Sequence, residues 1–201
     1  MIMRLITGMI NLCLAMVLLV GCSRSPRVTF YTFNATAAAE SAVQLLDPVI
    51  ISTVTLPDLL DRTNIVVTID ANRVEILEMH RWAAPLKSEI QRIISDDLAI
   101  LLKPTRVAAY QQNPSLDAVY RVQIDIRRFE MTEGKEVTVD LLWSIRHSHN
   151  GTVKNGHAVV REAVTSIGYE PLVAAQSRAL GSVSRDLAEV LRGMTTPSEV
   201  K

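Results

Sequence analysis

Apolar and polar residues alternate over two long segments in the second half of the chain. Within Val119–Phe129 the apolar residues Tyr120, Val122, Ile124 and Ile126 alternate with polar ones, and Glu136 to Arg146 repeat the pattern. A period of two is typical of strands that bury one face. Asn150-Gly151 follows and is a strong hairpin signal, so we expect residues 152–166 to form the returning strand.

Short runs rich in β-branched and aromatic residues predict further strands in the first half of the chain. The sequence between the first two runs is Ala-rich and predicts a loop or a weak helical turn over residues 34–47. Pro57 ends the second strand, and Asp70-Ala71-Asn72 forms a turn after the third. The expected strands are Phe30–Phe33, Val49–Leu56, Asn64–Asp70 and Arg73–Met79.

Apolar residues spaced three and four apart predict two amphipathic helices. The first helix follows Pro85 and is closed by Pro104, and the second opens at Pro171. The core face of the first helix carries Leu86, Ile90, Ile93, Ile94, Leu98 and Leu101, and the opposite face carries Lys87, Glu89, Arg92, Asp96 and Lys103. Asp96 and Asp97 cannot both point the same way from a helix, and we interpret this pair as part of a polar helix face and not as a site. The order of elements predicts an α+β fold, with an antiparallel-rich mixed sheet and both amphipathic helices packed on one face.

The first 21 residues have the pattern of a signal peptide. Arg4 precedes an apolar run from Leu5 to Val20, which is shorter than the roughly 20 apolar residues that a membrane-spanning helix needs. A retained membrane anchor is the less favoured alternative. Leu19-Val20-Gly21-Cys22 resembles the bacterial lipobox, in which the Cys thiol receives a diacylglyceryl group. The mature chain is therefore expected to begin at a lipidated Cys22, and Ser23 resembles the residue found in lipoproteins sorted to the outer membrane.

These features divide the chain into four parts. We expect a lipoprotein signal peptide at 1–21, the lipidated Cys and a short tether at 22–29, a single periplasmic α+β domain at 30–195, and a disordered C-terminal tail at 196–201. The seven residues from Ser23 to Thr29 span at most ~25 Å when fully extended. The domain should therefore lie close to the membrane.

Composition excludes several classes of function. The chain carries 21 basic and 21 acidic residues, and loss of Arg4 with the signal peptide leaves one acid in excess. A nucleic-acid partner is not expected, because such proteins normally have a basic excess or a basic face. Cys13 would leave with the signal peptide and Cys22 would be acylated. No thiol then remains for a disulfide, a zinc site or a nucleophile.

No residue pattern predicts catalysis, a metal site or a cofactor. His147 and His149 share a strand face, but no third ligand is near in sequence, so we interpret them as solvated side chains. The sequence contains no G-x-G-x-x-G loop for phosphate binding. Residues 198–201 match S-x-x-K only by chance, at a chain end where no core supports them.

Two motifs resemble a known family. Residues 55–62 read TLPDLLDR between two strands, and residues 82–86 read WAAPL before the first helix. With the lipobox, the order of elements and the length, they resemble the PqiC/YmbA-like family of ABC-type transport auxiliary lipoproteins, which work with MCE-domain proteins. That family usually has an aromatic residue at the position of Leu59 and an acidic one at the position of Ala84.

The motif residues have both structural and functional interpretations. Asp61 and Arg62 could brace a turn as a local ion pair, or they could contact a partner together with Pro57. Trp82, Pro85 and Leu86 are interpreted as residues that maintain the fold where the helix begins.

The resemblance implies a non-enzymatic lipoprotein, held at the outer membrane by its lipid and facing the periplasm. It would dock the periplasmic MCE-domain protein of an intermembrane lipid transport system, and copies of the chain could assemble with each other, since MCE proteins form rings. The alternative is an envelope lipoprotein that assembles or chaperones another outer-membrane protein. A lipoprotein hydrolase is a third option, but it lacks a nucleophile constellation.

Overall fold

The computed structural model describes residues 26–38, 45, 47–103, 106–109 and 117–194. The predicted signal peptide, Cys22, Ser23 and the predicted tail at 196–201 lie outside these residues. Within the described part the chain forms eight strands and two helices. They are β1 (Thr29–Tyr31), β2 (Val49–Thr55), β3 (Asn64–Asp70), β4 (Arg73–Trp82), α2 (Leu86–Leu101), β5 (Val107–Ala109), β6 (Tyr120–Thr132), β7 (Glu136–His147), β8 (Val153–Ala163) and α3 (Tyr169–Arg192).

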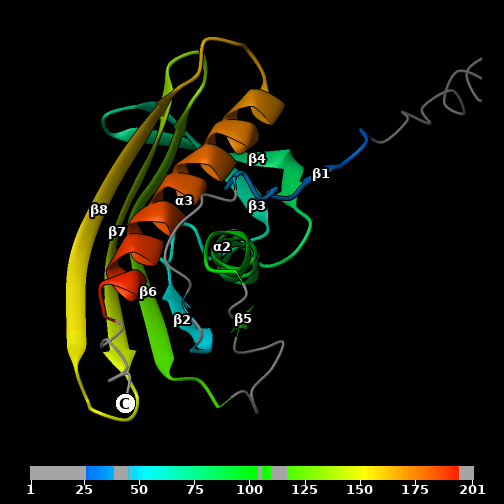
Figure 1. Ribbon diagram of the computed structural model, residues 1–201. Helices are drawn as coiled ribbons and strands as arrows, with labels where there is room; N and C mark the ends of the chain where they lie inside the picture. The colour runs from blue at the N-terminus through cyan, green and yellow to red at the C-terminus, as the bar shows by residue number, and fades with distance from the viewer. Residues whose placement is uncertain (1–25, 39–44, 46, 104–105, 110–116, 195–201) are drawn as a thin grey trace, which may run out of the picture.

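Five strands form the larger sheet, in the order β5-β2-β6-β7-β8. The pairs β6–β7 and β7–β8 are antiparallel, whereas β2 runs parallel to both β5 and β6. Helix α3 packs on β6, β7 and β8, and α2 packs on β2 and β5. Both helices cover the same face of the sheet and leave the other face to solvent (Figure 1).

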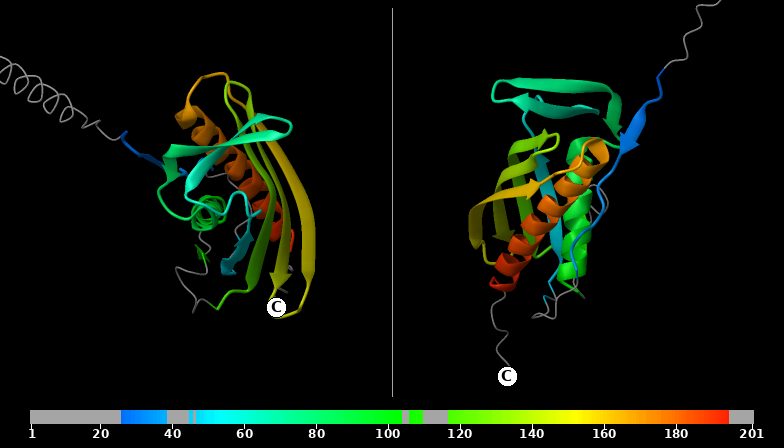
Figure 2. Two further views of the ribbon diagram at one scale, coloured as in Figure 1. Left: turned by 180° about the vertical axis from the view of Figure 1, so that it is seen from behind. Right: turned by 90° about the horizontal axis from the view of Figure 1, so that it is seen from above.

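The remaining strands form a second, smaller sheet in the order β1-β4-β3. The β3–β4 hairpin lies across one end of the larger sheet, and β1 adds to β4 in parallel (Figure 2). The predicted α+β class, with a mixed sheet and two helices on one face, is therefore confirmed, but the strands are divided between two sheets. Strand β5 was not predicted, because three residues are too few to show a period.

The alternation of β6 and β7 places their apolar side chains in the core, as the sequence predicted. Val122 and Ile124 of β6 and Val139 and Leu141 of β7 are almost completely buried, beneath α3. Gly156 on β8 lies directly against the indole ring of Trp143, so a side chain at this position would collide with the ring. Glycine at this position thus leaves room for the Trp143 ring between β7 and β8.

The two helices begin close to the predicted prolines. Pro85 is the residue before α2, and Pro171 lies in the first turn of α3, which begins two residues earlier at Tyr169. A proline is tolerated at these positions because the first backbone N–H groups of a helix have no partner within it. Neither of the two described helices is both long enough and apolar enough to cross a bilayer.

Candidate functional site

A groove of about 420 Å³ lies between the two sheets. One wall is formed by the loop that joins β2 to β3 and by the tip of the β3–β4 hairpin, and the other by Arg127–Glu130 of β6. The predicted loop residue Pro57 lines this groove together with Leu59 and Leu60. The structure thus brings the TLPDLLDR loop next to the exposed part of β6, about 70 residues further along the chain.

The groove combines an apolar floor with a charged rim. Leu59 and Val74 contribute apolar surface that is 41% and 43% exposed, and the buried Phe129 also lines the groove. The charged lining residues are Asp70, Arg73, Arg127, Arg128 and Glu130. Apolar surface surrounded by charged side chains is the usual composition of a site that another protein covers.

The loop has a defined internal geometry. Its backbone turns through hydrogen bonds from the N–H of Leu60 to the carbonyl oxygen of Pro57 (2.9 Å) and from the N–H of Arg62 to that of Leu60 (2.8 Å). Asp61 forms its ion pair with Lys87 at the start of α2 (2.6 Å), and not with Arg62. The Arg62 Nε donates to the carbonyl oxygen of Leu59 at 2.6 Å.

The local Asp61–Arg62 ion pair that the sequence suggested is therefore replaced by two separate interactions. Asp61 joins the loop to α2, while Arg62 closes the loop on itself. The side chains of Asp61 and Lys87 are 48% and 41% exposed, so this ion pair contributes only ~0–1 kcal/mol to stability. The side chains of Asp61 and Lys87 thus stay accessible to a partner. The role of Asp61 and Arg62 in docking stays a prediction.

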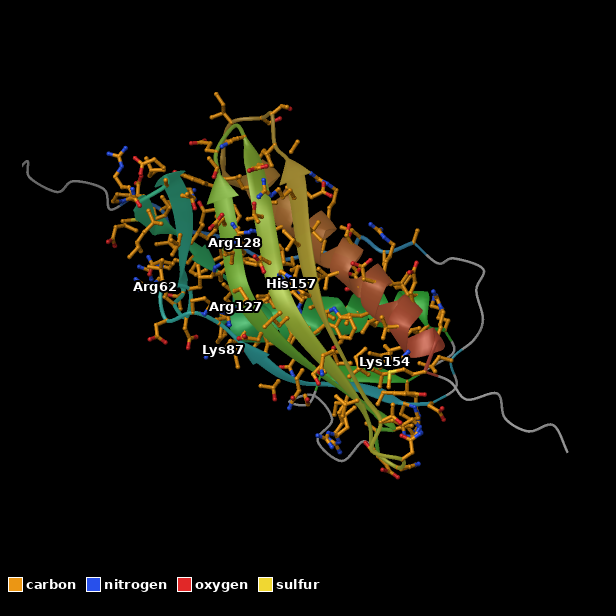
Figure 3. All side chains as sticks on the ribbon, turned by 90° about the vertical axis from the view of Figure 1, so that its left-hand side faces the viewer. Arg62, Lys87, Arg127, Arg128, Lys154 and His157 are labelled. Atoms are coloured by element: carbon orange, nitrogen blue, oxygen red, sulfur yellow. The ribbon has the colours of Figure 1, made fainter. Side chains whose placement is uncertain are left out.

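Basic side chains continue from the loop across the uncovered face of the larger sheet (Figure 3). Arg127 is 3.4 Å from Asp125 on the same strand, and Arg128 is 3.0 Å from Asp140 on β7. His157 on β8 also contacts Asp140, at 2.8 Å. The hydrogen bond from His157, together with Arg128, holds the pKa of Asp140 below its ordinary value. Asp140 therefore stays ionised and fixes the position of the Arg128 guanidinium at the groove.

Trp82, Pro85 and Leu86 lie together at the junction of β4 and α2. Trp82 is 4% exposed, and its ring centroid is 4.8 Å from that of Phe33. Leu86 is 2% exposed, on the first turn of α2. All three are placed where they could maintain the fold, and none lines the groove.

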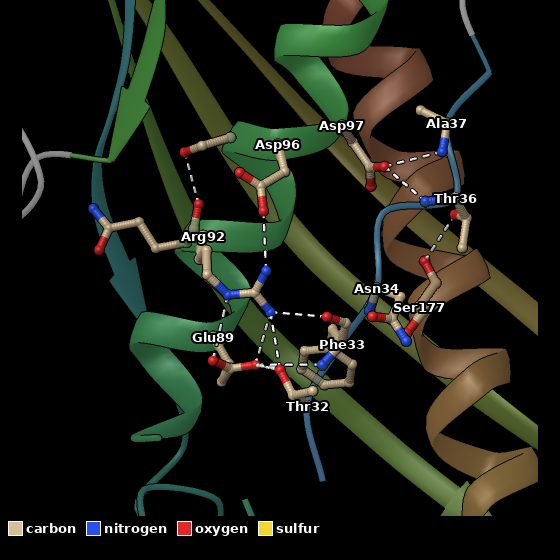
Figure 4. A network of polar contacts seen from close by, with 12 residues as sticks. Thr32, Phe33, Asn34, Thr36, Ala37, Glu89, Arg92, Asp96, Asp97 and Ser177 are labelled. Carbon is tan, nitrogen blue, oxygen red and sulfur yellow. Dashed lines mark hydrogen bonds and ion pairs between the residues drawn. The ribbon is translucent and has the colours of Figure 1, made fainter. Parts of the chain in front are cut away.

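A polar network beside this junction was missed by the sequence analysis (Figure 4). Glu89 was expected on the polar face of α2, but it is 6% exposed and accepts hydrogen bonds from the Thr32 hydroxyl (2.6 Å) and the Phe33 N–H (3.3 Å). Arg92 donates to the carbonyl oxygen of Phe33 at 2.8 Å. Burial raises the pKa of Glu89, but the hydrogen bonds from Arg92, Thr32 and Phe33 more than offset this, and the net pKa is lowered.

The expectation that Asp97 lies on the polar face of α2 was also wrong. Its side chain is fully buried between α2 and α3, and its Oδ1 accepts hydrogen bonds from the backbone N–H groups of Thr36 and Ala37, both at 3.0 Å. Ser184 of α3 donates to its Oδ2 at 3.5 Å. Gly181 provides the space for this arrangement, because a side chain there would collide with Thr36. The segment from Thr32 to Ala37, which we call the strap, is thus held against both helices.

A signal for this network is present in the sequence. Asp97 is four residues after Ile93 and four before Leu101, so it lies on the apolar stripe of α2. An acid on such a stripe must be paired or hydrogen-bonded when it is buried. What the sequence could not supply was the partner, because the backbone N–H groups of the strap carry no side-chain signature.

The histidines and acids of the described residues do not form a metal site. No group of three His, Cys, Asp or Glu side chains lies close enough to hold an ion in this part of the chain. His147 instead accepts weak hydrogen bonds at Nδ1 from the backbone N–H groups of His149 and Asn150, each at 3.3 Å. This arrangement braces the β7–β8 turn.

Comparison with known proteins identifies related sequences and folds. The family model described as "ABC-type transport auxiliary lipoprotein component" matches residues 31–188. Protein XCC0632 from Xanthomonas campestris has the same fold, with a TM-score of 0.71, 20% identity, and coverage of 83% of this chain and 97% of that one. A crystal structure of an uncharacterized protein gives a TM-score of 0.69 and 16% identity, covering 83% and 99% of the two chains. No curated protein matches the chain.

Proposed function

Because the chain belongs to the family of ABC-type transport auxiliary lipoprotein components, we propose that it docks the periplasmic MCE-domain protein of an intermembrane lipid transport system at the outer membrane. The chain would be held there through acylated Cys22 and would face the periplasm. The family description names a component of a transport system, which supports a non-enzymatic role. Its partner is proposed from the resemblance of the TLPDLLDR and WAAPL motifs.

The groove beside residues 57–62 is the observation that carries this proposal. It combines exposed apolar side chains, above all Leu59, with Arg127 and Arg128 on its rim. Its volume of about 420 Å³ would hold a few side chains of a partner and not a whole domain. A docking site of this kind binds a protruding loop or a strand end, with the apolar contact supplying affinity and the charges supplying orientation.

Anchoring would strengthen a contact of modest affinity. A short tether keeps the groove near the membrane, and the second contact of an already tethered molecule forms at a high effective concentration. Copies of the chain that assemble around a ring-shaped partner would add further contacts of the same kind. A homo-oligomer is therefore part of the proposal, with the groove repeated in each copy.

Replacing Asp61 and Arg62 by Ala tests the docking role of the loop. If the loop docks the partner, the double variant should bind the MCE-domain protein several-fold more weakly while its thermal melting temperature stays nearly unchanged. The matched control is Arg185→Ala with Asp186→Ala, an adjacent pair of the same two residue types that is exposed on α3. Binding is measured by calorimetric titration of each folded variant.

Two results would contradict the proposal. Wild-type affinity in a well-folded Asp61/Arg62 double variant would remove the loop from the docking site. Co-purification of the wild-type chain with an outer-membrane β-barrel protein, and not with an MCE-domain protein, would favour the role in assembling or chaperoning another membrane protein.

A further inference from the structure

The tether enters the fold at a fixed point. Strand β1 pairs in parallel with the end of β4, with Thr29 opposite His80 and Tyr31 opposite Trp82. The Tyr31 hydroxyl hydrogen-bonds to Nδ1 of His80 at 2.8 Å, and the His80 ring lies 4.2 Å from that of Tyr169 at the start of α3. These contacts, together with the strap that follows, prevent β1 from moving independently of the domain.

Only a short segment separates this point from the proposed lipid anchor. Cys22 precedes Thr29 by seven residues, which reach at most ~25 Å. This segment contains Arg24 and Arg27 and no acidic residue. Basic residues next to an acyl chain are attracted to the phosphates of lipid headgroups, and they strengthen the binding of the chain to the membrane surface.

Two large apolar side chains are exposed at the same end of the molecule. Phe30 on β1 is 63% exposed, and Ile167, in the loop between β8 and α3, is 85% exposed. Figures 1 and 2 show the beginning of α3 beside β1, and Phe30 shares a surface hollow with Glu170 and Val173 of α3. Among the described large apolar side chains, Ile167 has the largest exposed fraction. It precedes Glu170 by three residues, so it lies close to β1, where the tether enters the fold.

The loop that carries Ile167 has a fixed position. The N–H of Gly168 donates to Oε1 of Glu133, in the β6–β7 turn, at 2.7 Å. Gly168 has a φ of +108°, a conformation that other residues rarely adopt. The loop is thus held at the end of the sheet, with Ile167 pointing away from the core.

We propose that this end, defined by Arg27, Phe30 and Ile167, sits on the surface of the bilayer that holds the lipid anchor. Phe30 and Ile167 enter the headgroup region, and Arg27 binds lipid phosphates. The inference rests on the proposed anchoring at Cys22, but it does not depend on docking to an MCE-domain protein. It assigns a second contact with the membrane and with it a fixed orientation of the domain.

The orientation follows from the length of β8. Ile167 follows the end of this strand, whereas Asn150 precedes its beginning, in the β7–β8 turn. The 11 residues of β8 span about 36 Å, so the two positions lie at opposite ends of the molecule. If Ile167 contacts lipid, Asn150 faces the aqueous phase well above the bilayer.

Spin labels at these two positions test the inference. Cys13 is lost with the signal peptide and Cys22 is acylated, so a cysteine introduced by Ile167→Cys or Asn150→Cys is the free thiol of the mature protein. The acylated full-length product is reconstituted into vesicles of phosphatidylethanolamine and phosphatidylglycerol. The label at 167 should become several-fold less accessible to a water-soluble nickel chelate and more accessible to oxygen than the label at 150. Adding Phe30→Ser should reduce this difference.

The outcomes separate the inference from the anchoring on which it rests. If the protein floats with the vesicles and the nickel chelate reaches both labels equally, anchoring stands and the proposed membrane contact is overturned. If the acylation-competent protein stays in the aqueous fraction, the anchoring is overturned and the inference falls with it. Burial of the label at 150 instead of 167 would reverse the orientation and refute the assignment.

Discussion

Replacing Asp97 by Ala should destabilise the protein far more than the same change at the adjacent Asp96. Asp97 is fully buried and accepts two backbone hydrogen bonds from the strap, each at 3.0 Å. Loss of the carboxylate leaves the N–H groups of Thr36 and Ala37 without this acceptor, and an unsatisfied buried donor costs ~1–3 kcal/mol. Since both groups are only partly buried, water can replace some of the lost bonding. We expect the free energy of unfolding to fall by about 2–4 kcal/mol.

Two further variants separate the hydrogen bonds from the charge. Asp97→Asn keeps an oxygen that can accept both backbone bonds and should cost only ~1 kcal/mol. Asp96 is 48% exposed and pairs with Arg92 at 3.0 Å, so Asp96→Ala should cost ~0–1 kcal/mol. Unfolding in urea is followed by the fluorescence of Trp82 and Trp143, in a mature chain carrying Cys22→Ser. Equal losses for Asp97→Ala and Asp96→Ala would refute the proposed role of the carboxylate.

The pH dependence of Asp97→Asn provides a second test. Burial raises the pKa of Asp97 above its ordinary value, although hydrogen bonds from Ala37, Thr36 and Ser184 oppose this. A raised pKa means that the folded protein binds the proton more tightly than the unfolded chain. The stability of the wild type relative to Asp97→Asn should therefore rise as the pH falls through the folded-state pKa, and level off below the unfolded-chain value. A difference in unfolding free energy that is constant or falls on acidification would contradict this.

Three other predictions concern separate parts of the molecule. Trp82→Ala should lower the free energy of unfolding by ~3–5 kcal/mol, because the indole is buried against Phe33; an unchanged melting temperature would contradict it. Cys22→Ser should abolish membrane retention, and fractionation that still finds the mature variant in outer membranes would exclude the proposed anchor. Asp140→Asn should reduce stability near neutral pH but not at low pH. The stability that a lowered pKa of Asp140 contributes is lost as the pH falls through the folded-state pKa. Equal unfolding curves of the wild type and the variant at neutral pH would show that the contacts with His157 and Arg128 contribute nothing.

Local patterns in the sequence were sufficient to predict the antiparallel strands and the two helices. The alternation of β6 and β7 follows directly from one buried and one exposed face, and the spacing of Ile90, Ile93 and Leu101 defines the buried stripe of α2. The division into two sheets could not be predicted in this way. Parallel pairing of β1 with β4 and of β2 with β6 joins distant segments, and the residues in them show only that each is extended.

The candidate site was predicted in part. The sequence singled out Pro57 and its loop, because a charged loop between two apolar strands has no role in the core. The structure adds Arg127 and Arg128, which come from a strand whose exposed face was identified but whose position relative to the loop was unknown. Glu89 was missed because a helical period assigns side chains to a face but does not show whether another segment covers that face. Asp97 lies on the apolar stripe, and what the sequence could not supply was the backbone N–H groups of the strap that bind it.

The position of β2 in the larger sheet has a consequence for how the protein acquires its structure. This strand has the sequence VIISTVT, and its first residue, Val49, pairs with Val107 and Tyr120, 58 and 71 residues later. Pairing over such separations is slow, because a long loop must close before the contact forms. In a chain that is synthesised from its N-terminus, β2 is exposed before either neighbouring strand has been made. During that interval this apolar segment is open to misassembly, so β2 is where we expect a chaperone to bind the nascent chain.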